Sequence, residues 1–235
     1  MGRQRGLLIP GLFVLVALAV LLALGFWQVE RLAWKENLIA SLDRRISAPP
    51  VALPPSKDWP NLSQDASEFR RVTATVEYLD RPRAYVYTGG SALRPDIKAP
   101  GYFVFAPARL STGDTVVINA GYVSDRDHPW PPTNGEIAGY LRWPEARSPF
   151  VSDHDAAGSI WHVRDHRLMA ERLGWLDVPP FYIDLESPVP PSGLPKPGPL
   201  TVKLHNDHLG YAITWFGLAT VLVVVFLLWS VRPAS

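Results

Sequence analysis

The 235-residue sequence contains no cysteine and only two methionines. The absence of cysteine excludes disulfides, thiol redox centres, thiolate copper sites and covalent haem attachment through a Cys-x-x-Cys-His motif. Two methionines are too few for a methionine-rich copper site. Any metal chemistry is therefore expected to use histidine, of which the chain has six.

The common signatures of enzymes are also missing. The chain has no Gly-x-Ser-x-Gly elbow, no phosphate loop, no Gly-x-Gly-x-x-Gly turn and no His-Glu-x-x-His pair. Basic residues are scattered without an aromatic-basic stripe, which argues against nucleic acid as a partner. The protein is therefore expected not to be an enzyme. The competing class, a membrane-anchored periplasmic hydrolase, requires a Ser/His/Asp or metal cluster in a pocket.

Three short stretches superficially resemble metal sites. His162 and His166 are four residues apart, but no third ligand is spaced to join them. Residues 125–128 and 153–155 combine Asp with His inside connections rich in Pro and Gly, where solvated loops are the default. We interpret all three as core, surface or loop residues.

Long apolar runs stand at both ends of the chain. Residues 7–27 and 208–231 are predicted transmembrane helices, because a helix needs about 20 apolar residues to cross a bilayer. The first run is too long for the apolar region of a secretory signal, and residues 25–28 offer no small-x-small cleavage site. We therefore expect a retained anchor at each end.

Short basic tails predict the orientation. Arg3 and Arg5 lie in the tail of residues 1–6, and Arg232 lies in the tail of residues 232–235. Short basic segments stay in the cytoplasm, whereas a long domain crosses largely regardless of its charge. Both termini are thus expected in the cytoplasm, with the main domain in the periplasm of a bacterial inner membrane or, in a mitochondrion, in the intermembrane space.

The segments that flank the central domain have distinct compositions. Residues 28–45 are predicted to continue the first helix beyond the membrane, with Trp27, Arg31, Trp34 and Leu38 on one stripe. Arg31 suits an anionic group such as a lipid head or a propionate, because its planar fork binds carboxylates. Residues 46–68 are predicted to form an extended Pro-rich linker, and residues 187–207 a Pro-rich arm with a last strand at residues 200–204.

Residues 69–186 between these segments are predicted to form a β-rich domain. Alternating apolar residues predict several strands, and residues 111–114 form a good hairpin turn. One helix is expected to begin after Asp165 as its N-cap and to end at Gly174. The predicted fold class is an α+β membrane protein with two transmembrane helices bracketing one largely antiparallel sheet domain that carries one or more helices.

The stretch of residues 205–216 joins this domain to the last helix and carries the candidate site. His208 and Trp215 are seven residues apart, so they share a helix face near the membrane edge, with Tyr211 and Ala212 between them. An imidazole above aromatic rings suits a flat apolar cofactor with polar edges. Spacing alone still favours simple interfacial anchoring, which is common for Trp, Tyr and His.

An ordered set of motifs along nearly the whole chain resembles the Surfeit-locus assembly factors of cytochrome c oxidase. The set comprises Trp27-Gln28-x-x-Arg31, Leu53-Pro54, Phe69-Arg70-Arg71-Val72, Gly101-Tyr102, Val117-Ile118-Asn119-x-Gly121-Tyr122-Val123, Trp161-x-x-Arg164-Asp165-x-x-x-Met169-Ala170-x-x-x-Gly174 and Asn206-Asp207-His208-Leu209-x-Tyr211-Ala212-x-Thr214-Trp215. The resemblance implies a factor that helps to assemble the haem a sites of oxidase subunit I, and it implies haem a binding by His208 and Trp215.

Further expectations follow from this resemblance. His208 is expected to ligate the haem iron, and Arg31 to pair with propionates. Trp215 is expected to pack against the ring, with Tyr211 or Trp27 as a further contact. Haem a is then a transient cargo, and the expected partners are subunit I, membrane lipid and, as a further candidate, haem a synthase. The runner-up is a haem-free scaffold that stabilises a subunit I intermediate, with His208 only an anchor.

Three residues depart from the pattern of the resembling family. Val76 stands where Gly is usual, Ala120 where Arg is usual, and Ser124 where Pro is usual. All three fall in the predicted sheet domain. They put a partner-docking surface carried over from relatives in question and leave the membrane-edge residues untouched.

Overall fold

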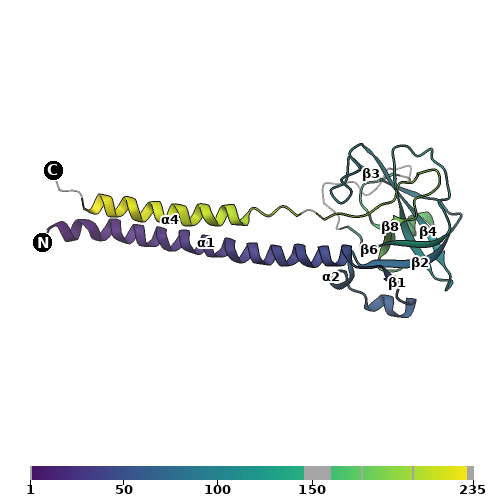
Figure 1. Cartoon of the computed structure of the whole chain (residues 1–235), viewed down its shortest axis with the longest axis horizontal. Coiled ribbons are helices and arrows are strands. Elements are labelled where there is room, and N and C mark those ends of the chain that lie inside the picture. The colour runs from purple at the N-terminus through teal and green to yellow at the C-terminus, as the bar shows by residue number, and fades with distance from the viewer. Residues whose placement is uncertain (1, 146–159, 176, 203, 232–235) are drawn as a thin grey trace. The chain divides into compact units, whose positions relative to one another are not determined.

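The computed structural model describes residues 2–145, 160–175, 177–202 and 204–231, with side chains described from residue 8 onward. The chain divides into two compact units, Met1–Ser41 with Leu204–Ser235, and Leu42–Lys203. Figure 1 labels the elements of both units.

The first unit is a pair of antiparallel helices that lie side by side (Figure 1). Helix α1 spans Gly2–Ser47 and continues into the second unit, and helix α4 spans His208–Ser230. Both helices are long and apolar enough to cross a membrane. The predicted class of an α+β membrane protein with two terminal apolar helices is confirmed.

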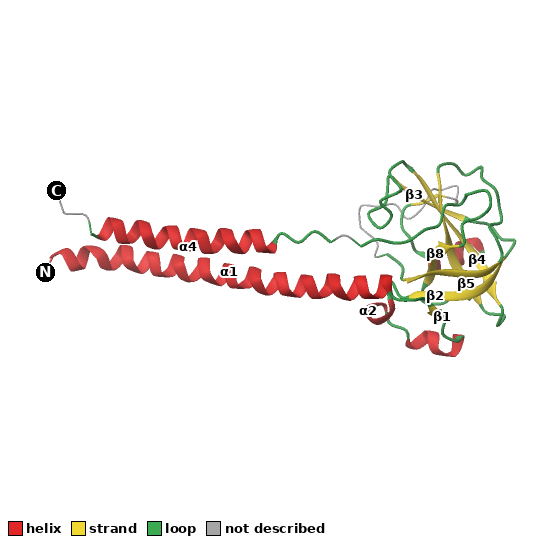
Figure 2. Cartoon of the chain, viewed as in Figure 1, coloured by secondary structure: helices red, strands yellow, loops and turns green. Residues whose placement is uncertain are grey.

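The second unit is built on one eight-stranded sheet in the order β1-β2-β6-β8-β5-β4-β3-β7. A further pairing of β2 with β4 joins β2, β6, β8, β5 and β4 into a closed barrel, visible as the curled yellow strands in Figure 2. The strands are β1 (Val51–Ala52), β2 (Arg71–Tyr78), β3 (Ala84–Thr88), β4 (Gly101–Leu110), β5 (Thr115–Val123), β6 (Gly135–Arg142), β7 (Ile160–Trp161) and β8 (Tyr182–Ser187). The pairings are antiparallel except β1–β2, β3–β7 and β5–β8, as expected for a largely antiparallel sheet.

Strand β4 pairs with two different strands along one of its edges. Its first half pairs with β3 and its last residues pair with β2, while β5 runs along its other side. The register with β5 shifts between Phe103 and Phe105. Such an irregularity bends a strand, which lets β4 leave β3 and close the barrel on β2.

Two apolar clusters fill this unit. The cluster inside the barrel joins β2, β5, β6 and β8 and includes Val72, Ile118, Leu141 and Ile183. The second cluster packs helix α3 (His166–Leu173) through Met169 against Phe103, Phe105, Trp161 and Tyr182. The predicted limits of this helix are confirmed. The side chain of Asp165 accepts a hydrogen bond from the N–H of Leu168, and Gly174 adopts the left-handed conformation at φ 67°.

A buried polar chain crosses the barrel wall. The Asn119 amide donates to Asp184 Oδ1 at 2.9 Å, and Arg142 Nη1 lies 3.7 Å from Asp184 Oδ2. Arg142 Nε also donates to Glu68 Oε1 at 3.2 Å. Burial raises the pKa of Asp184. Because isolated buried charges are costly, this chain of partners ties strands β5, β6 and β8 to the segment before β2.

The segment predicted as an extended Pro-rich linker, residues 46–68, is instead largely folded. It contains β1, the 3₁₀ helix η1 (Ser56–Asn61) and helix α2 (Gln64–Ser67). Trp59 of η1 is 8% exposed, donates its indole N–H to the Pro54 carbonyl at 2.8 Å and packs edge-on against Phe181. Prolines prevent a long helix here, but a Pro-rich extended segment still pairs with a strand edge and delivers this indole to the barrel.

The strand predicted at residues 200–204 is also corrected. Residues 200–202 and 204 are not part of any strand. The Thr201 N–H donates to the Leu93 carbonyl at 2.8 Å, so the segment is held to a loop. Alternating apolar residues predicted a strand, but the one backbone–backbone hydrogen bond described for residues 200–202 and 204 joins Thr201 to a loop and not to a strand.

Replacement of Trp59 by Ala tests whether the Pro-rich segment belongs to the folded core. Loss of this indole from the barrel is expected to lower the free energy of unfolding by about 3–5 kcal/mol. Urea unfolding of the full chain in detergent micelles, followed by the sheet signal in circular dichroism, measures the change. Lys57→Ala in the same η1 helix is the control, since its side chain is exposed and the expected change is within about 0.5 kcal/mol. Equal stability of the two variants would contradict the assignment.

Candidate functional site

Helix α4 begins at the candidate ligand itself. His208 is the first residue of α4, after Asp207 at the N-cap, whose carbonyl accepts a hydrogen bond from the Tyr211 N–H at 3.2 Å. Just outside the helix, His205 Nε2 lies 2.7 Å from Asp207 Oδ2, with 86% of the His205 side chain exposed. The two nearby histidines therefore differ in setting, because His208 is half-buried and His205 faces outward.

One face of α4 carries His208, Ala212, Trp215 and Ala219. Their spacing of four, three and four residues is the spacing of a helix–helix seam. Ala212 and Ala219 are buried, and His208 and Trp215 are half-buried, whereas Leu209 is exposed. The imidazole and the indole therefore share one face of α4, about 10 Å apart along the axis.

The facing surface of α1 has a small residue next to a polar one. Gly25 is buried, and a Cβ at this position would lie 2.7 Å from Cε1 of Phe216. Gln28 is buried one turn further out. Because Gly25 has no side chain, the Phe216 ring packs directly on the α1 backbone and the helices approach closely.

The imidazole of His208 is bonded to the facing helix. Its Nδ1 lies 2.6 Å from Gln28 Oε1. The amide oxygen only accepts hydrogen bonds, so Nδ1 carries the proton in the neutral ring, and Nε2 is left with its lone pair. In the described part of the chain no residue hydrogen-bonds to Nε2. A neutral imidazole with one nitrogen held by an acceptor and the other bare is the form in which histidine binds metals.

The remaining predicted site residues lie beside this pair with exposed side chains. Trp27 is 49% exposed and Tyr211 is 55% exposed. Arg31 is exposed as well, with its guanidinium 4.5 Å from the centre of the Trp34 ring. The structure thus brings together His208 and Gln28, and it leaves Trp27, Arg31 and Tyr211 open to their surroundings.

Helical geometry gives the two flanks of the pair different characters. At about 100° per residue, counted from Gln28 and from His208, Trp27, Arg31 and Tyr211 all fall on one flank of the antiparallel pair. Gly25 and Phe216 fall on the other flank, where the Phe216 ring also packs edge-on against Phe26 at 5.4 Å between centroids. One flank is therefore packed, and the other exposes two aromatic rings and a guanidinium.

Sequence reasoning missed Gln28 as a site residue. It was visible only as part of the Trp27-Gln28-x-x-Arg31 motif. A signal did exist, since Gln28 is an amide directly after an apolar run, where a buried polar side chain needs a partner.

The other described histidines lie apart from one another, each with its own neighbours. His166 is fully buried with Nε2 hydrogen-bonded to the Pro179 carbonyl at 2.9 Å, whereas His162 is exposed against the Tyr87 ring. His128 contacts the Tyr85 hydroxyl and the Pro129 carbonyl. Residues 153–155 lie outside the described residues. Within the described ranges no three His, Asp or Glu side chains are grouped to hold a metal.

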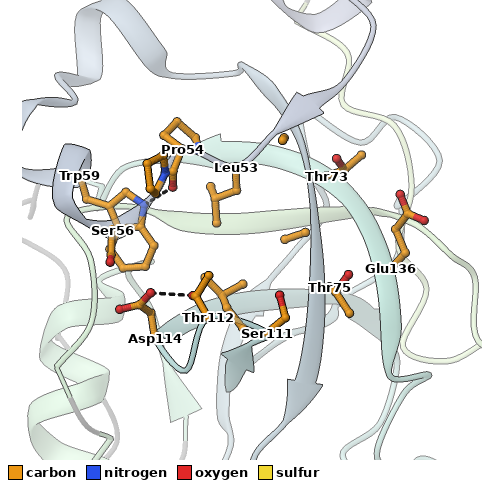
Figure 3. Close-up of a pocket in the computed structure, with 14 residues that line it drawn as sticks. Leu53, Pro54, Ser56, Trp59, Thr73, Thr75, Ser111, Thr112, Asp114 and Glu136 are labelled. Carbon is orange, nitrogen blue, oxygen red and sulfur yellow. Dashed lines mark hydrogen bonds between the residues drawn. The ribbon is translucent and has the colours of Figure 1, made fainter.

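Two cavities in the second unit bear on the hydrolase interpretation. The first, about 270 Å³, opens beside the hairpin of β4 and β5, and Figure 3 shows Thr112 hydrogen-bonded to Asp114 at its edge, with Trp59 and Leu53 beside them. The second, about 500 Å³, shares Ser56, Trp59 and Asp114 with the first, and its remaining lining mixes apolar residues with Thr115, Arg167 and Asp177. No histidine is among the described residues that line either cavity, so neither holds a Ser/His/Asp cluster.

Comparison with known proteins gives the family. The model of the SURF1 family matches residues 15–220 of this chain. The chain belongs to the SURF1 family. It is 32% identical over 219 residues to Surfeit locus protein 1 of Rattus norvegicus, covering 88% of this chain and 71% of that protein. It is 33% identical over 217 residues to Surfeit locus protein 1 of Homo sapiens, covering 83% and 69%, and 28% identical over 227 residues to a SURF1-like protein of Rickettsia felis, covering 93% and 95%. The resemblance seen in the sequence is confirmed.

The structure locates the three residues of this SURF1 chain that depart from the pattern. Val76 and Ala120 are buried in the barrel cluster. Ser124, directly after β5, is exposed. Two of the three changes therefore concern core packing, and only Ser124 lies on a surface.

The burial of His166 predicts a pH dependence. Burial lowers the pKa of His166 from 6.5 to about 4. The unfolded chain thus binds this proton first as the pH falls, so stability present above pH 6.5 is lost between pH 6.5 and about 4, by up to about 3 kcal/mol. Urea unfolding near pH 7 and near pH 4 measures how much the free energy of unfolding falls between the two. This fall is expected to be smaller in His166→Gln than in wild type by about 3 kcal/mol. The control His162→Gln, at an exposed site, keeps the full loss, and equal losses in all three proteins would refute the prediction.

Proposed function

We propose that this protein is an assembly factor for haem-copper (cytochrome c) oxidase. In this proposal it binds haem a at the outer membrane edge and aids its insertion into subunit I. Haem a is a transiently held cargo, and the protein itself performs no catalysis. Membership of the SURF1 family supports this proposal, together with the ordered motifs that resemble the oxidase assembly factors.

The observation that carries the proposal is the setting of His208. Its Nδ1 bonds to Gln28, its Nε2 keeps a lone pair, and the ring stands at the outer end of an apolar helix pair. His208 would hold the iron of haem a through this nitrogen, which is a common role for a neutral imidazole. One protein ligand at an open flank gives modest affinity, which suits a carrier that has to release its cargo.

The residues around His208 fit an amphipathic porphyrin. Tyr211 and Trp215 lie deeper than His208 along α4 and offer aromatic faces to the ring, and Trp27 lies at nearly the same level on α1. Arg31 lies one turn further out, where its guanidinium suits propionates. Arg31 would hold the acidic edge of haem a, and the aromatic side chains of Tyr211, Trp215 and Trp27 would hold its apolar ring.

The proposed location follows from the same layout. Both helices span the bacterial inner membrane, with both termini in the cytoplasm and the barrel unit in the periplasm, because the short tails carry Arg3, Arg5 and Arg232. Subunit I is the proposed recipient, membrane lipid surrounds the site, and haem a synthase is a candidate donor.

A haem-free scaffold for a subunit I intermediate is the second candidate. The hydrogen bond from His208 to Gln28 also supports this role, since it links two helices near the membrane edge without any ligand. The two functions differ in whether wild-type protein carries the pigment.

The absorption spectrum of protein purified from cells that make haem a tests the proposal. Wild type is expected to show a haem a band, and His208→Ala is expected to lose most of it because the axial ligand is gone. His205→Ala is the matched control three residues away, with an exposed ring, and it should keep the band. An absent band in wild type, or an undiminished band in His208→Ala, refutes the carrier function and leaves the scaffold.

A further inference from the structure

The buried amide of Gln28 is distinctive within the helix pair. Among the described residues of the two-helix unit, Gln28 is the only polar side chain that is buried. Burial of an amide without a partner costs about 1–3 kcal/mol. The hydrogen bond between Gln28 and the His208 ring offsets this cost. That bond is the 2.6 Å contact from Nδ1 to Oε1.

We propose that Gln28 is a positioning residue that holds His208 in the Nδ1–H tautomer and so presents Nε2 to the haem iron. This inference rests on the proposed haem a binding. A neutral imidazole has one proton for two nitrogens, and a metal binds only the bare one. An acceptor fixed on Nδ1 therefore decides in advance which nitrogen is available.

The geometry gives this bond an orienting role as well. Gln28 is held on the buried face of α1, where Gly25 lets the helices approach, so the amide has little freedom to follow a moving ring. The imidazole is thereby fixed in tautomer and in plane before any ligand arrives. Partners of this kind, bonded to the far nitrogen of a metal-binding histidine, typically change metal affinity by about 10–100-fold when removed.

A simple helix clamp is the alternative role for the same bond. The two roles diverge when the direction of the hydrogen bond is reversed. Gln28→Glu keeps an acceptor and hence the Nδ1–H tautomer, whereas Gln28→Lys offers only donors, which places the proton on Nε2. Both variants keep a bond between the helices, but only the first leaves Nε2 bare. Gln28→Leu removes the bond altogether.

The tautomer is measured without haem. Nitrogen NMR of the full chain in detergent micelles, labelled at histidine and recorded at a pH where His208 is neutral, distinguishes the two forms, and His208→Ala assigns the signal. Wild type and Gln28→Glu are expected in the Nδ1–H form, and Gln28→Lys in the Nε2–H form. A wild-type signal in the Nε2–H form overturns the inference, whatever the haem experiments show.

Titration with haem a supplies the second measurement. Affinity is expected to fall by about 10–100-fold in Gln28→Leu and in Gln28→Lys, and to be retained in Gln28→Glu. Asn37→Leu, which removes an exposed amide from the same helix, should bind as wild type does. Retained affinity in Gln28→Lys with loss only in Gln28→Leu indicates a clamp and overturns the inference alone. Failure of wild type to bind haem a overturns the proposed function as well.

Discussion

The hydrogen bond between His208 and Gln28 is the interaction on which the character of the helix pair depends. Both helices are otherwise almost wholly apolar along their spans, and in lipid apolar contacts alone do little to fix how two helices face each other. One polar contact at the N-terminal end of α4, with Gly25 and Phe216 packed further along the pair, fixes how the two helices are rotated against each other. The same contact favours the neutral imidazole tautomer with its proton on Nδ1. The same two side chains, His208 and Gln28, therefore orient the helices and orient the imidazole.

Much of the fold was predictable from local sequence rules. The limits of α3 followed from Asp165 as a cap and Gly174 as a left-handed end, and both were confirmed because each rule concerns backbone groups within one turn. The folding of residues 46–68 was not predicted. Proline content correctly indicated the absence of a long helix, but the burial of Trp59 depends on a barrel assembled from distant strands. The error at residues 200–204 has the same origin, since a strand needs a free edge as well as a pattern.

The candidate site was predictable on one helix and not across two. Period 3.6 placed His208 and Trp215 on one face, and the structure has both on the face that meets α1. No pattern within α4 indicates which residue of α1 faces His208, because that depends on the register of two segments about 180 residues apart. Gln28 was therefore identified only as part of the Trp27-Gln28-x-x-Arg31 motif and not as a site residue. The exposed positions of Trp27, Arg31 and Tyr211 likewise follow from how the two helices are rotated.

The packing of Phe216 on Gly25 closes one flank of the helix pair and leaves the two flanks unequal. The Phe216 ring blocks a planar ligand from reaching His208 on its own flank. On the flank of Trp27 and Tyr211, the described residues present no such obstruction. Among the described residues of the helix pair, the flank of Trp27 and Tyr211 is thus the open approach to the His208 imidazole. In the proposed carrier function, loading and release of haem a would use this same flank, so one haem would have to leave before the next binds. This order would follow from the lack of a side chain at Gly25, which lets Phe216 fill the opposite flank.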